Sequence, residues 1–152
     1  MRETSQSELS VMERQLDEMR GTSQSEALLQ VIRWISEPEM RDSRKRLILK
    51  QKTSLSSWSA EEKTNAKKVC VFFDVIEILI KNRVIPAGVI EVHWANTIIL
   101  CRQAADELIQ NARTTIRPDA WKEFEDLCTR AREVVPFAMS NLSRTQVGHP
   151  ET

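Results

Sequence analysis

Apolar residues recur at steps of three and four along most of this chain, which is the spacing of one face of an α-helix. The pattern predicts helices over about 9–19, 24–35, 38–52, 60–82, 86–111 and 120–135. The chain has only three glycines and no tyrosine, so a sheet with tight hairpins is not expected. We therefore predict an all-α fold, a compact bundle of five to six helices.

The first predicted helix carries one narrow apolar stripe at its N-terminal end. The stripe consists of Leu9, Met12, Leu16 and Met19, and we expect Gly21 to end the helix. Fewer than three heptads cannot sustain an isolated coiled coil, and short isolated helices are marginal in water. The stripe must therefore dock on its own domain or on a partner.

The same reading divides the chain into three parts. We expect an amphipathic N-terminal helix over 1–20, a single helical domain over 22–140 and a disordered tail over 141–152. Pro136 is expected to limit the last helix, and the polar residues after it have little to bury. A chain of 152 residues has room for about one domain of this kind.

The helix over 60–82 is apolar around nearly its whole circumference, so we expect it at the centre of the bundle. Ser59 and Glu62 form a predicted capping box at its start. Its polar residues fall on one narrow stripe that includes Asp74 and Glu77. This stripe faces either water or a buried partner.

A series of segments in this order resembles a bacterial domain-of-unknown-function family, DUF4760, over about 27–132. The segments are SEPEMRDSR at 36–44, VFFDVIEILI at 71–80, NRVIP at 82–86, Trp94, Arg113 and WKEFEDL at 121–127. The resemblance implies an all-helical domain in which the positions of Asp74, Trp94, Arg113 and Glu125 recur as a set, and it implies no activity. Family members often look as if a membrane helix precedes this domain, whereas this chain offers only the polar-faced helix over 9–19.

Four charged residues are candidates for a polar cluster inside the bundle: Asp74, Glu77, Arg113 and Glu125. Our interpretation is a structural ionic cluster, because buried carboxylates need charged partners. The alternative is a polar pocket for a ligand. Two carboxylates three residues apart on one helix face can also hold a hard cation or take part in acid-base chemistry, but no ExxH partner and no second carboxylate pair accompany them.

A local excess of positive charge lies in the third predicted helix. It consists of Arg41, Arg44, Lys45, Arg46, Lys50 and Lys52. Such a helix can follow a phosphate backbone or lie on an anionic bilayer, although a solvated basic face is the simpler interpretation. The chain as a whole has 22 basic and 22 acidic residues, so no net field attracts polyanions.

The remaining chemistry is sparse. Cys70, Cys101 and Cys128 lie in apolar stretches without zinc-ligand spacing, so we expect buried free thiols and a cytoplasmic protein. His93 has no nucleophile at recognisable spacing and is expected to be a partly exposed helix residue. No segment reaches the roughly 20 apolar residues of a membrane helix, and the N-terminus does not resemble a secretory signal.

From these patterns we expect no enzyme, cofactor or metal. Our functional hypothesis is a non-catalytic protein-interaction or oligomerisation module, with a partner that is either a second copy or a different protein. The stripe of the first helix is the candidate contact surface. The alternative is binding of nucleic acid or an anionic membrane surface through the basic helix over 41–52.

Overall fold

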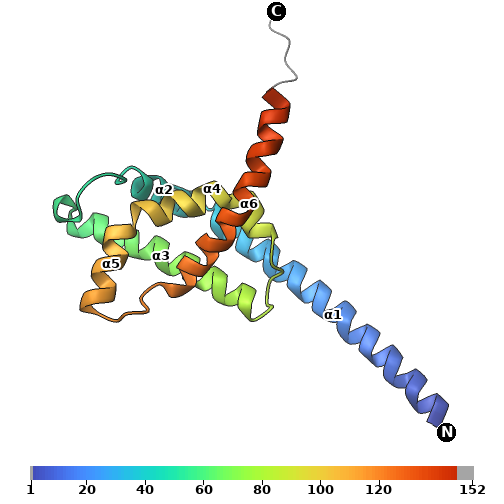
Figure 1. The fold of residues 1–152 in the computed structure, drawn as a ribbon. Coiled ribbons are helices and arrows are strands. Elements are labelled where there is room, and N and C mark those ends of the chain that lie inside the picture. The colour runs from blue at the N-terminus through green and yellow to red at the C-terminus, as the bar shows by residue number, and fades with distance from the viewer. Residues whose placement is uncertain (1, 147–152) are drawn as a thin grey trace, which may run out of the picture.

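The structure, a computed structural model, describes residues 2–146, with side-chain surroundings for residues 8–135. Figure 1 shows an all-helical molecule, and no strand occurs in this part of the chain. The elements are α1 (Arg2–Ser36), α2 (Pro38–Ile48), a short 3-10 helix η1 (Leu55–Ser57), α3 (Ala60–Lys81), α4 (Val89–Ala104), α5 (Asp106–Thr115) and α6 (Lys122–Gln146). The predicted fold class is confirmed.

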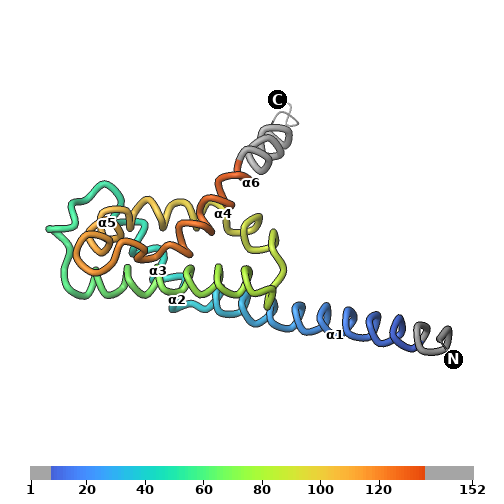
Figure 2. Tube along the Cα trace, turned by 60° about the horizontal axis from the view of Figure 1, so that its bottom comes forward, coloured from blue at the N-terminus to red at the C-terminus, as the bar shows by residue number. Residues whose placement is uncertain are grey.

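The body of the molecule is built around α3, α4 and α6. The most extensive contact joins α4 to α6, followed by α3 with α6 and α2 with α3. In Figure 2 the long α3 runs along the lower side of the body, with α4 and α6 above it. Phe73 of α3 and Phe124 of α6 meet at a ring-centroid distance of 5.0 Å, and both are buried. Apolar packing between these two helices therefore lies at the middle of the core.

The prediction that Gly21 ends the first helix is wrong. Residues 2–36 form one continuous helix, so the expected boundary between 1–20 and 22–140 falls inside α1. A glycine inside a helix costs only about 1 kcal/mol relative to alanine and does not block the backbone hydrogen bonds. The hydroxyls of Thr22 and Ser25 donate to the carbonyls of Glu18 and Gly21, so both side chains remain compatible with the helix.

The caps of α2 and α3 follow the sequence to different degrees. The Ser59–Glu62 capping box is present as predicted, with the Glu62 N–H donating to Ser59 Oγ at 3.0 Å. The helix α2 has no side-chain cap: Ser36 is the last residue of α1, and Glu37 precedes Pro38 without a capping hydrogen bond from its side chain. That helix ends at Ile48 rather than near residue 52.

Two further expectations about the body need correction. The outer face of α3, with Val71, Val75 and Ile78, is exposed, so this helix is not covered on nearly all sides. The helix expected over 86–111 is two helices, because the backbone breaks at Ala105 between α4 and α5. Ala104 and Ala105 are both buried, and small side chains permit a close turn there.

The last helix extends further than expected. It passes Pro136 and ends at Gln146, so the first part of the segment over 141–152 is helical. The rest of that expected disordered tail, residues 147–152, lies outside the described residues.

Candidate functional site

The N-terminal half of α1 projects away from the helical body, as Figures 1 and 2 both show. Every residue from 8 to 23 is exposed, and we name this segment the arm. The stripe residues Leu9, Met12, Leu16 and Met19 are 51–66% exposed. No described part of the chain covers the stripe, although apolar side chains in such a row favour burial.

The C-terminal half of α1 is held firmly by the body. Val31 and Ile35 are buried in the core, and the Gln24 amide donates to the Arg83 carbonyl at 2.8 Å. The buried Arg44 of α2 donates from Nη1 to the Ile35 carbonyl at 2.7 Å and so caps the end of α1. The arm is therefore the continuation of an anchored helix.

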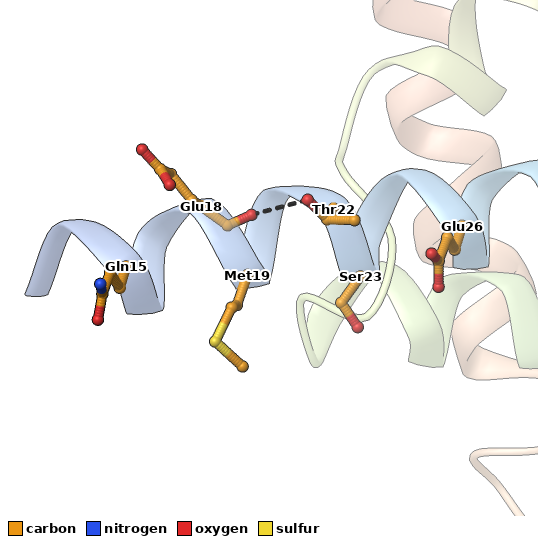
Figure 3. Close-up of a pocket in the computed structure, with 6 residues that line it drawn as sticks. All are labelled: Gln15, Glu18, Met19, Thr22, Ser23 and Glu26. Carbon is orange, nitrogen blue, oxygen red and sulfur yellow. Dashed lines mark hydrogen bonds between the residues drawn. The ribbon is translucent and has the colours of Figure 1, made fainter. Parts of the chain in front are cut away.

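A shallow recess of about 540 Å³ lies against the helix at the root of the arm. Figure 3 shows the side chains that line it. Its lining residues all belong to α1: Gln15, Glu18, Met19, Thr22, Ser23 and Glu26. Ser23 and Glu26 continue the three-to-four residue spacing of the stripe beyond Met19. The contact face is therefore apolar up to Met19 and polar beyond it.

The four residues of the expected polar cluster do not meet in one place. Glu77 instead forms an ion pair with Arg130 of α6, and Arg130 Nη2 lies 3.4 Å from Glu91 Oε1 of α4. The side chains of Glu77 and Glu91 are 1% and 3% exposed. Glu91 also accepts a hydrogen bond from the Gly88 N–H at the start of α4, where Gly88 has a φ of 101° that favours glycine.

Burial dominates the electrostatics of this group. Loss of hydration raises the pKa of Glu77 to about 7, although Arg130 and Lys81 act in the opposite direction. Two buried carboxylates share one arginine, so the group as a whole carries an excess of negative charge. The arrangement joins α3, α4 and α6 and offers an ion-pair role rather than a reaction.

The raised pKa of Glu77 predicts a specific pH dependence. The Glu77 carboxyl loses its proton near pH 4.5 in the unfolded chain and near pH 7 in the folded chain, so the folded state binds this proton more tightly. The free energy of unfolding is therefore highest below pH 4.5, and this contribution is lost as the pH rises through 7. Glu77→Gln should remove this slope, and relative to wild type it should gain on the order of 2 kcal/mol in free energy of unfolding between pH 5 and pH 8. Urea unfolding at both pH values measures the difference. The exposed Glu133→Gln is the control, and parallel pH curves for wild type and Glu77→Gln would contradict the argument.

Asp74 and Lys81, from the same stripe of α3, hold the first turn of α6. The Phe124 N–H donates to Asp74 Oδ1 at 2.7 Å, so a residue of another helix supplies the N-terminal cap. Lys81 Nζ lies 2.5 Å from Glu123 Oε2 and 2.6 Å from Asp126 Oδ2, and these hydrogen bonds raise the pKa of Lys81. Asp74, Glu77 and Lys81 on this side of α3 thus all contact α6.

Removal of the Asp74 cap should have a moderate effect. Asp74→Ala leaves the Phe124 N–H without its acceptor and should lower the free energy of unfolding by about 1–2 kcal/mol. Asp74→Asn keeps an acceptor oxygen of the same geometry and is the matched control. Urea midpoints compare the two variants, and an equal loss in both would show that the carboxylate charge, rather than the hydrogen bond, matters.

The other two members of the expected cluster lie elsewhere. Glu125 pairs with Arg102 Nε, and Arg102 Nη1 donates to Asp106 Oδ1 at 2.8 Å. Arg102 is 5% exposed, so this pair fixes the α4–α5 break against α6. Arg113 Nε donates to the Ala120 carbonyl at 3.1 Å and forms no salt bridge within the described residues.

Sequence reasoning missed the three charged partners that complete these pairings, Glu91, Arg102 and Arg130. Two of them lie beside apolar residues of their helix: Glu91 follows Ile90, and Arg102 follows Cys101. A charged residue beside apolar residues is the available signal, because burial of a charge costs free energy unless an opposite charge pairs with it. Arg130 stands between Thr129 and Ala131 and gives no such signal. The signal identifies the residue but not its partner.

The basic helix retains only part of its charge for a partner. Arg44 is buried against the end of α1, Arg46 lies 3.0 Å from Asp42, and Lys50 pairs with Glu62. Arg41, Lys45 and Lys52 are exposed and form no salt bridge in the part of the chain that the structure describes. The six residues therefore do not form a continuous free patch.

The remaining candidates are placed as expected or carry no site. Cys70, Cys101 and Cys128 are buried and free, and burial raises the pKa of Cys101 to about 12. His93 is exposed, with its ring 5.8 Å from that of Trp94. Among the described residues, no group of three or more histidine, cysteine, aspartate or glutamate side chains is placed to hold a metal ion.

Comparisons with known proteins identify one relationship. The model of a family described as a domain of unknown function, DUF4760, matches residues 4–131. No curated protein and no solved structure matches the chain. The match begins within α1, so it includes the arm that the resemblance over 27–132 left out. None of the helices within residues 2–146 has the length and hydropathy needed to cross a bilayer.

Proposed function

We propose that this chain, which belongs to the DUF4760 family, is a protein-interaction or oligomerisation module that binds through the arm. The family description names no function, so the proposal rests on the exposed surface of the arm. The supporting observation is an apolar stripe that is exposed over its whole length on an anchored, projecting helix. A lone helix of this length is marginal in water, since packing of the apolar face supplies most helical stability. A partner that covers the stripe stabilises the arm.

The charges of the arm favour a protein over an anionic surface. Residues 8–20 contain four acidic residues, Glu8, Glu13, Asp17 and Glu18, and two basic residues, Arg14 and Arg20. This segment is therefore net negative, which disfavours phosphate backbones and anionic lipid. An apolar stripe with charged flanks is typical of a helix that packs on another helix.

A charge placed in the stripe should abolish association. Leu16→Glu puts a carboxylate at the centre of the contact, and burial of an unpaired charge costs several kcal/mol, so association should weaken more than about tenfold. The matched control is Val11→Glu, because Val11 is equally exposed on the same helix but lies off the stripe. Light scattering on a sizing column should give a multiple of 17.5 kDa for wild type and Val11→Glu and a monomer for Leu16→Glu. A wild-type mass of one chain at all concentrations would contradict the proposal.

A further inference from the structure

We infer that the partner of the arm is the arm of a second copy, and that the two helices pair antiparallel. In this register, the residue numbers of any two residues that face each other add up to 28. This inference rests on the proposed function and specifies its partner. The arm is a continuous helix whose stripe is exposed from Leu9 to Met19, and a second copy offers a stripe of equal length. Each arm continues a helix that is anchored in its own body, so the pair is not an isolated coiled coil. Two such arms pack as a short two-helix coiled coil with a two-fold axis between residues 12 and 16.

The register follows from matching apolar to apolar positions. With a sum of 28, Leu9 faces the partner's Met19, and Met12 faces the partner's Leu16. The two-fold axis repeats both pairs, so all eight stripe residues are covered. Beyond the stripe, each helix continues with the polar Ser23.

A parallel arrangement fits the same sequence less well. In register, it places Glu26 opposite the partner's Glu26 in the seam, and Glu8 beside the partner's Glu13 on each flank. Like charges at these positions destabilise a coiled coil. The antiparallel pair keeps one such contact, between the two copies of Glu13 at the two-fold axis. Charge therefore favours the antiparallel pair.

The shape of the molecule favours the same arrangement. The body holds α1 from Gln24 onward, and residue 24 faces position 4 of the partner in this register. The overlap of about 20 residues therefore spans about 30 Å at 1.5 Å per residue and ends where each body begins. The two bodies lie at opposite ends of the paired arms, whereas a parallel pair brings both bodies to the same end.

Thiol cross-linking on the full chain tests the register, since the native cysteines are all buried. A mixture of Leu9→Cys and Met19→Cys should form disulfide-linked dimers at least about tenfold faster than either variant alone, because pairing raises the local thiol concentration from micromolar toward millimolar. In a parallel pair, by contrast, Met19→Cys would form disulfide-linked dimers without any Leu9→Cys in the sample. Light scattering on the reduced variants checks that they still associate.

A second variant leaves the stripe intact. Gln15 flanks the seam beside the partner's Gln15 only in the antiparallel pair, so Gln15→Cys should cross-link to itself with a short bismaleimide. Arg14→Cys, on the outer face, is the matched control and should react at least about tenfold more slowly.

The outcomes separate this inference from the proposed function. Association in which Met19→Cys cross-links to itself, or in which Gln15→Cys reacts no faster than Arg14→Cys, overturns the antiparallel pair and leaves the interaction module in place. The second result would indicate that the arm docks on the body of the other copy, for example near the exposed Leu49 of the basic segment. A wild-type chain that remains monomeric overturns both.

Discussion

Arg130→Ala should lower the free energy of unfolding by about 3–5 kcal/mol, one of the two largest effects we expect from a single substitution. Arg130 is the shared partner of Glu77 and Glu91, and both glutamates are almost wholly buried. Its removal leaves two buried carboxylates without their ion-pair partner in the middle of three helices. Burial of an unpaired charge is far more costly than the loss of a surface pair.

Urea unfolding at pH 7.5 measures this effect, and the chain supplies its own control. Arg132→Ala removes an exposed arginine from the same helix and should change the free energy of unfolding by less than about 0.5 kcal/mol. Adding Glu77→Gln to Arg130→Ala should recover part of the loss, since one of the two charges then disappears. Equal, small effects of Arg130→Ala and Arg132→Ala would show that the pair contributes nothing to folding.

Phe73→Ala should cost a comparable amount, about 3–5 kcal/mol, for a different reason. The Phe73 ring is 1% exposed and packs on Phe124 across the contact between α3 and α6. Alanine removes most of the apolar surface and leaves a cavity that two anchored helices cannot close. The melting temperature and the urea midpoint should both fall strongly.

The neighbouring phenylalanine is the control for this experiment. Phe72 lies at the edge of the core and is only partly buried, so Phe72→Ala should cost distinctly less, about 1–2 kcal/mol. A larger loss for Phe72→Ala than for Phe73→Ala would mean that α3 packs on a different face. Because neither residue belongs to the arm, both variants should keep the oligomeric state of wild type.

The charged site could be predicted only in part. Asp74 and Glu77 stand out as carboxylates in an apolar helix, but their partners Phe124 and Arg130 lie 50 and 53 residues away. Spacing within one helix states which residues share a face and does not state which helix that face meets. The expected cluster therefore became separate pairings that lie at different helix contacts.

The arm illustrates the opposite case. The spacing of the stripe residues predicts one apolar helix face: Leu9, Met12, Leu16 and Met19. In the structure no described segment covers this face, so the stripe is exposed. The continuity of α1 through Gly21 was missed, since a glycine between two amphipathic segments is read as a stop. Tertiary anchoring of residues 24–36 outweighs the modest cost of that glycine.

Local periodicity and capping chemistry alone thus establish the helical class, the α3 start at Ser59 and the apolar stripe of the arm, because these properties involve residues within a few turns of one another. The tertiary structure decides which helix faces the Asp74 side of α3, which arginine serves Glu77 and Glu91, and how much of the basic helix is already paired. Those choices depend on contacts between segments distant in sequence, where burial makes pairing obligatory but spacing cannot select the partner.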